Sequence, residues 1–118
     1  MKKLAPDIYR QRLLIEGYYG IGVNKHVINK YFKDIVKSLE LKIYGKPIIF
    51  SPGGLGKKKN QGYDAFVPLI DSGISVYVWS NAKFISVLIY SCKKFIIKKA
   101  VDFTRDFFGI DKMKFKGF

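Results

Sequence analysis

Alternating hydrophobic and polar positions, the period of a half-buried β-strand, recur through much of this chain. β-Branched and aromatic residues fill these stretches, and turn residues separate them. The pattern predicts strands at 12–19, 41–51, 63–70, 74–79 and 84–92, and a last short strand in the tail at 110–118. Pro47 and a glycine interrupt the second stretch, which indicates an edge strand or a bulge. Asp71, Ser72 and Gly73 are expected to form the turn between the third and fourth strands.

Two other segments repeat their hydrophobic residues with the period of an α-helix. The first follows Asn24, a suitable N-cap, and runs to Leu39. The second covers about 93–108 and stops at Gly109. Its expected apolar side consists of Phe95, Ile96, Ala100, Val101, Thr104, Phe107 and Phe108. The resulting order, β-α-β-β-β-β-α-β, predicts an α+β fold in which two helices pack on one face of a largely antiparallel sheet.

Length and composition limit the classes of protein that fit. The 118 residues suit one domain spanning 1–118, and a hydrophobic content of 48% excludes a disordered chain. With one cysteine, Cys92, and one histidine, His26, neither a disulfide framework nor a Cys/His zinc site forms within one chain. No apolar run approaches the roughly 20 residues of a spanning helix, and the N-terminus lacks the apolar stretch of a signal peptide. We therefore expect a cytoplasmic protein without a metal site or membrane segment.

The net charge of +13 is the strongest global feature, but it does not select a partner. Lysines are spread along the chain and include the loop at 57–59. Biased composition, an anionic small ligand, nucleic acid and an acidic protein partner would each account for this charge. Nucleic acid is the less favoured partner, although the charge does not exclude it.

Several candidate motifs have a structural explanation when each is taken alone. GGLGKKK at 53–59 lacks the glycine offset and the Ser or Thr of a phosphate-binding loop, which favours a solvated loop. His26 lies beside the apolar positions of the first helix, which favours a surface residue. Cys92 ends an apolar strand and fits a small buried hydrophobe. None of these motifs defines a function without the others.

Taken together, four features lie in register. FSPGG at 50–54 precedes an acidic residue and a serine, Asp71 and Ser72; Trp79 follows that serine by seven positions, and Cys92 comes thirteen positions later. In this register the chain resembles the prokaryotic S-adenosylmethionine decarboxylases, small pyruvoyl enzymes of polyamine synthesis. The resemblance extends over most of the chain and includes Leu13, Glu16 and Tyr18 of the first strand.

The resemblance implies roles for these residues. In the family, the serine attacks the preceding carbonyl, the chain is cleaved, and a pyruvoyl group remains at the new N-terminus as an electron sink for decarboxylation, while a cysteine returns a proton to the substrate. Ser72 would become the pyruvoyl group, which is the only cofactor implied, and Cys92 would be the acid. Family members also build their sites between two chains, which implies a homo-oligomer. The site implied here comprises Asp71, Ser72, Tyr77 and Cys92 as catalytic residues and Glu16, Phe50, Trp79 and Asn81 as contacts to S-adenosylmethionine or a related adenosine ligand.

Departures from the family pattern concentrate in the self-processing residues. Tyr77 stands where the family has a histidine that assists chain cleavage, and Gly73 stands where a histidine follows the serine. Asn81 replaces the acidic residue that holds the ribose, but an amide still hydrogen-bonds a hydroxyl. The adenosine-binding half is therefore preserved better than the processing half.

Three functional hypotheses follow. The first is a self-processing S-adenosylmethionine decarboxylase-like enzyme. The second is an unprocessed lyase on the same scaffold that binds and cleaves S-adenosylmethionine or a nucleotide-bearing derivative, a reaction that needs positioning more than a cofactor. The third is a non-enzymatic basic binding module, which rests only on charge and aromatic content.

Overall fold

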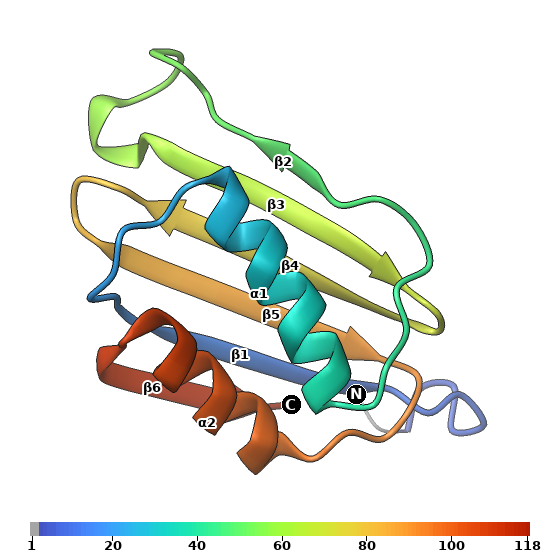
Figure 1. The fold of residues 1–118 in the computed structure, drawn as a ribbon. Coiled ribbons are helices and arrows are strands. Elements are labelled where there is room, and N and C mark those ends of the chain that lie inside the picture. Colours follow the sequence, from blue (N-terminus) through green and yellow to red (C-terminus); the bar gives the residue numbers. More distant parts are fainter. Residues whose placement is uncertain (1–2) are drawn as a thin grey trace.

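The computed structural model describes residues 3–118 as one layer of helices on one antiparallel sheet (Figure 1). The sheet order is β2-β3-β4-β5-β1-β6, and every neighbouring pair is antiparallel. Both helices cover the same face, which confirms the predicted α+β architecture and the predicted order of elements. The elements are β1 (Gln11–Tyr18), α1 (Lys25–Ser38), β2 (Ile48–Phe50), β3 (Gly62–Leu69), β4 (Ser72–Trp79), β5 (Phe84–Ser91), α2 (Ile97–Phe108) and β6 (Asp111–Gly117), with a short 3-10 turn at Lys58–Asn60.

The core lies between the helices and one face of the sheet. Alternate residues of the central strands point toward the helices, as the two-residue period requires, and many of them are fully buried. Where the helices meet, the Tyr31 hydroxyl and the Thr104 Oγ1 atom lie 2.7 Å apart and both residues are fully buried. The largest fully buried side chains are Tyr31, Phe32, Phe108, Leu13, Ile15, Ile28, Ile35, Ile74, Ile85 and Ile89.

The predicted start of the first helix at Asn24 and the predicted end of the second at Gly109 are both confirmed. The Asn24 side chain accepts a hydrogen bond of 2.9 Å from the Val27 amide, which satisfies a free donor of the first turn of α1. Gly109 has a φ of 60° at the end of α2, and its N–H donates to the Arg105 carbonyl. Glycine adopts this left-handed conformation at a helix end without the strain that a Cβ atom adds for most other residues.

Three predicted element boundaries were wrong, and two of them concern the sheet. The strand expected at 41–51 is only Ile48–Phe50, because the chain before Pro47 leaves the sheet after a single bridge between Ile43 and Leu69. The turn expected at 71–73 is instead Ile70 and Asp71, since Ser72 already pairs with Leu69 as the first residue of β4.

The second helix also begins later than expected, at Ile97 instead of about residue 93. The Gln11 side chain holds Phe95 in an extended connection, accepting from its amide and donating to its carbonyl, each at 2.9 Å. Ile96, expected on the apolar side, is 54% exposed because it precedes the first turn of α2. Within residues 3–118, neither helix is long and apolar enough to cross a membrane.

Candidate functional site

Ser72 is held at the start of β4 by a buried neighbour on β5. Its register partner is Ser91, and the two hydroxyl oxygens lie 2.7 Å apart. The fully buried Ser91 hydroxyl donates to the Lys93 carbonyl at 2.6 Å and accepts from the Lys93 amide at 2.9 Å. Because a hydroxyl carries one proton, Ser72 must be the donor in the bond between the two serines. The Ser72 proton is therefore directed at an acceptor, and its lone pairs remain available.

Asp71, which precedes Ser72, has a backbone conformation and a carbonyl hydrogen bond that bear on cleavage of the bond between them. Asp71 has a φ of 61°, in the left-handed region that non-glycine residues seldom occupy. Its carbonyl oxygen accepts a hydrogen bond of 2.7 Å from the Cys92 amide. Its carboxylate lies 3.8 Å from the Lys93 Nζ atom, and since both side chains are exposed, that ion pair contributes little. An N–H donor is thus in place where negative charge would develop if a nucleophile attacked the Asp71 carbonyl.

Three of the predicted catalytic residues line one cavity. Its volume is about 370 Å³, and Asp71, Ser72 and Cys92 all contribute to it. The Cys92 side chain is exposed and not a buried hydrophobe. Gly73 allows the Phe66 ring to lie against β4, because a Cβ atom at this position would lie 2.8 Å from that ring. The remaining lining residues are Phe66, Gly73, Ser75, Leu88 and Tyr90.

Tyr77 and Trp79 lie at the other end of β4, in a different cavity of about 350 Å³. Ser72 and Trp79 are seven residues apart on one strand, which corresponds to about 23 Å. Tyr77 is about 17 Å from Ser72 by the same measure. Within one chain Asp71, Ser72 and Cys92 therefore form one group, and Trp79 forms a second group that includes the predicted catalytic residue Tyr77.

The lysine-rich loop folds back onto this second group. The indole Nε1 atom of Trp79 donates to the Asn60 side chain at 3.2 Å, and the Asn81 amide donates to the Lys58 carbonyl at 3.1 Å. Gln61 shapes the loop from inside, since its side chain accepts from the Gly54 amide at 2.9 Å and donates to the Leu55 carbonyl at 2.6 Å. Lys57 lines the same cavity as Trp79. The loop therefore brings positive charge beside the predicted adenosine contacts.

The two remaining predicted contacts lie on the sheet face that the helices leave uncovered. Glu16 of β1 accepts a hydrogen bond of 2.9 Å from the Ser86 hydroxyl of β5. Phe50, at the end of the edge strand β2, pairs with Asp64 and is 66% exposed. Neither residue lines the cavity of Ser72.

Sequence analysis missed residues that support both groups. Ser91 orients Ser72, and Phe84 supports Trp79 by an edge contact with a ring-centre distance of 5.5 Å. A signal for Ser91 was present, since a serine at an inward position of an otherwise apolar strand needs a polar partner. Gln61 gave no such signal, because its partners are loop backbone groups. Among residues 3–118, no group of three or more His, Cys, Asp or Glu side chains is arranged to hold a metal ion.

Comparison with known proteins identifies the family and the fold. The sequence model of the family described as S-adenosylmethionine decarboxylase matches residues 17–118. The chain belongs to the S-adenosylmethionine decarboxylase family. Its fold is similar to that of the adenosylmethionine decarboxylase from Aquifex aeolicus VF5, with a TM-score of 0.72 over 94% of this chain and 89% of that chain, at 16% identity. No curated protein sequence matches the chain. The fold and family expected from the sequence are thereby confirmed.

Proposed function

We propose that this chain is a pyruvoyl-type S-adenosylmethionine decarboxylase, a lyase of polyamine synthesis that makes its own cofactor from Ser72. One observation carries the proposal. Asp71, Ser72 and Cys92 line one cavity, the Asp71 carbonyl accepts a hydrogen bond from the Cys92 amide, and the Ser72 hydroxyl is held by Ser91. These are the groups that chain cleavage and the later return of a proton would use.

Each of these groups has a defined part in processing. The Ser72 oxygen forms a bond to the Asp71 carbonyl carbon, the peptide C–N bond breaks, and the released amine takes up the hydroxyl proton. The Cys92 amide stabilises the negative charge that forms on the Asp71 oxygen during this attack. Loss of the Ser72 α-proton then expels Asp71 as a carboxylate, and hydrolysis of the remaining enamine releases ammonia. The resulting pyruvoyl group would supply an electron sink for decarboxylation.

A second copy of the chain would complete the site. The sheet face away from the helices exposes apolar and aromatic side chains on several strands, including Phe66 at 42%, Tyr90 at 41% and Tyr77 at 40%. An exposed face that carries several large aromatic side chains is typical of an interaction surface. Two such faces packed in opposite directions would bring Trp79 and Phe50 of one copy toward Ser72 and Cys92 of the other. This would join the two groups that lie about 23 Å apart in a single chain.

The test of processing is the intact mass of the protein under denaturing conditions. Cleavage predicts two fragments, one that ends at Asp71 and one that begins at position 72. The N-terminus of the second fragment would be blocked by a pyruvoyl group. Ser72→Ala should give one full-length species. A single full-length species from active wild-type protein would contradict the proposal.

A second candidate is an unprocessed lyase acting on a phosphate-bearing derivative of S-adenosylmethionine. It is supported by the position of Lys57 beside Trp79 and by the replacement of the processing histidine by Tyr77. In this reaction the substrate carboxylate attacks the carbon next to the sulfonium, so the protein needs only to position the substrate. Labelled S-adenosylmethionine separates the candidates, since decarboxylation releases carbon dioxide whereas the lyase releases methylthioadenosine and homoserine lactone. If neither product forms and no adenosine ligand binds, a non-enzymatic binding module is the remaining candidate.

A further inference from the structure

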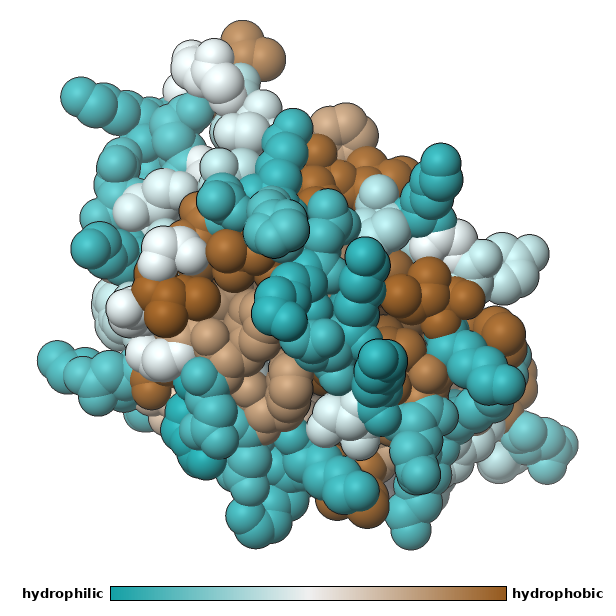
Figure 2. Space-filling view, viewed as in Figure 1, coloured by the Kyte–Doolittle hydropathy of each residue, from teal (hydrophilic) through white to brown (hydrophobic). Residues whose placement is uncertain are grey.

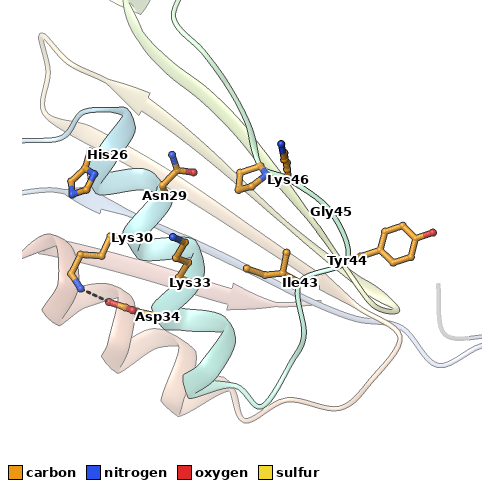
Figure 3. Close-up of a pocket in the computed structure, with 10 residues that line it drawn as sticks. His26, Asn29, Lys30, Lys33, Asp34, Ile43, Tyr44, Gly45 and Lys46 are labelled. Carbon is orange, nitrogen blue, oxygen red and sulfur yellow. Dashed lines mark hydrogen bonds and ion pairs between the residues drawn. The ribbon is translucent and has the colours of Figure 1, made fainter.

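A cleft that shares no lining residue with the cavity of Ser72 separates the outer side of α1 from the segment that leads into β2 (Figure 3). Its volume is about 830 Å³, which lies within the usual range for small-molecule sites. The helix contributes residues three and four positions apart, which therefore share one side of α1. The lining residues are His26, Asn29, Lys30, Lys33, Asp34, Ile43, Tyr44, Gly45, Lys46 and Pro47.

Both walls of the cleft are fixed. The Tyr44 amide donates to the Pro68 carbonyl and the Ile70 amide donates to the Lys42 carbonyl, each at 2.9 Å. These bonds tie the segment at 43–47 to the end of β3, although it is not itself a strand. The opposite wall, α1, is anchored by its buried side in the core. The cleft is therefore formed before any ligand enters, which lowers the entropy that binding would cost.

Two lysines in the cleft lack a charge partner. Lys30 is paired with Asp34 at 3.0 Å, as Figure 3 shows. Lys33 and Lys46 come from opposite walls, and neither has an ion pair or side-chain hydrogen bond within residues 3–118. Figure 2 shows hydrophilic side chains over α1 with hydrophobic patches on both sides. Positive charge and apolar surface thus meet along this helix.

We propose that this cleft binds a small phosphorylated organic molecule that is not the substrate of the Ser72 site. Its phosphate would lie between Lys33 and Lys46 and would receive one charge-assisted contact from each wall. Asn29 and His26 would hydrogen-bond its polar groups, and Ile43 and Pro47 would cover its apolar part. The size of the cleft favours such a molecule over a simple inorganic anion. A single nucleic-acid strand is held by aromatic rings that stack its bases, and of the two aromatic side chains in the lining, His26 and Tyr44, the tyrosine points outward (Figure 3).

The experiment uses uridine diphosphate as the probe, because it lacks the adenine that the other site would recognise. We expect it to bind with a dissociation constant below about 1 mM, and uridine alone not to bind measurably. Lys33→Gln with Lys46→Gln should weaken binding by about 10-fold or more. Lys37→Gln with Lys42→Gln is the matched control, because both lysines are exposed and outside the cleft while the change in net charge is the same. The control pair should change the affinity by less than about twofold.

Amide chemical shifts in NMR spectra locate the ligand independently. Addition of uridine diphosphate should shift the resonances of residues 26–34 and 43–47 and leave those of Ser72 and Cys92 in place. Equal weakening in the two double variants would show non-specific charge attraction and overturn the proposal. The proposal also fails if a thymidine dodecamer binds more tightly than uridine diphosphate and loses affinity equally in both variants.

Discussion

The hydroxyls of Ser72 and Ser91 share one hydrogen bond, and which of them donates the proton decides whether the Ser72 oxygen is free to act as a nucleophile. Because Ser91 already donates to the Lys93 carbonyl, the Ser72 hydroxyl is turned toward Ser91 and its oxygen is left free to act as a nucleophile. In the proposed cleavage Ser91 would therefore act by positioning Ser72. A residue of this kind is expected to affect the rate of chain cleavage more than any later step.

We predict that Ser91→Ala slows cleavage between Asp71 and Ser72 by about 10-fold or more, because the Ser72 hydroxyl loses its acceptor and becomes free to rotate. The measurement is the time course of full-length protein and fragments by mass spectrometry. Ser38→Ala, at the end of α1, is the control and should cleave at the wild-type rate. Ser91→Thr, which keeps the hydroxyl, should recover most of the rate. Full-rate cleavage in Ser91→Ala would remove Ser91 from the mechanism.

The buried phenol of Tyr31 is expected to make the free energy of unfolding depend on pH in the alkaline range. Burial raises the pKa of its phenol above the ordinary value of 10.0, and the hydrogen bond to Thr104 only partly opposes this effect. Above pH 10 the unfolded chain releases this proton whereas the folded chain keeps it, so rising pH favours unfolding. Tyr31→Phe should flatten the fall in unfolding free energy above pH 10 by up to about 1.4 kcal/mol per pH unit. Urea unfolding between pH 8 and pH 11 tests this, with Tyr44→Phe as the exposed control; equal slopes in all three proteins would contradict it.

At the scale of elements, the helices follow from local chemistry whereas one strand and one turn do not. Asn24 and Gly109 predict the end of each helix because a side-chain cap and a left-handed residue act within a few residues. The late start of α2 depends on Gln11, which is 84 residues away from Phe95. The turn ends at Asp71, earlier than the expected Gly73, because Ser72 already pairs with Leu69 and Ser91. Contacts between distant segments decide such boundaries, and periodicity does not contain them.

The same distinction applies to the candidate site. Asp71, Ser72 and Cys92 were predicted from the family resemblance that their spacing carries, and they lie at one cavity. The separation of Trp79 from them follows from the straight path of β4, which the spacing alone did not reveal. The proton direction at Ser72 depends on a buried hydroxyl on another strand, so only the three-dimensional structure supplies it.

We expect Gly109→Ala to lower the free energy of unfolding by about 1 kcal/mol, because alanine is strained at a φ of 60°. Gly22→Ala is a suitable control, since a Cβ atom there would meet no neighbour within 4 Å and its φ is not left-handed. Chemical denaturation of both variants gives the difference. An unchanged midpoint for Gly109→Ala would show that the end of α2 tolerates the strain by local rearrangement.

At the scale of the whole molecule, the proposed assembly rests on the face of the sheet that the helices leave uncovered. Leu14 lies on this face between Leu88 and Lys116 of the neighbouring strands. We expect Leu14→Lys to convert an oligomer into monomers, because an unpaired charge would be buried where two faces meet. Leu4→Lys, outside the sheet and 69% exposed, should leave the assembly unchanged. Sedimentation analysis distinguishes the two, and a wild-type monomer would contradict the proposed assembly.

A shared site also predicts complementation between two inactive variants. Ser72→Ala keeps Trp79, and Trp79→Ala keeps Ser72, so a mixed pair would contain one complete site. If the proteins are mixed in denaturant and refolded together, we expect up to about one quarter of the wild-type decarboxylase activity, since half of the random pairs are mixed and each has one complete site of two. Each variant refolded alone should stay inactive. No gain on mixing would place the whole site within one chain.

The strand order has a consequence for the protein after cleavage. A cut between Asp71 and Ser72 would give one fragment with β1, β2 and β3 and another with β4, β5 and β6. In the sheet these pieces interleave, because β1 lies between β5 and β6 while β3 lies beside β4. Neither fragment would have a complete set of neighbours without the other, and both would contribute to one hydrophobic core. The nicked product should therefore migrate as a single species under native conditions and separate only in denaturant, so the fold can lose a peptide bond at its proposed reaction site without coming apart.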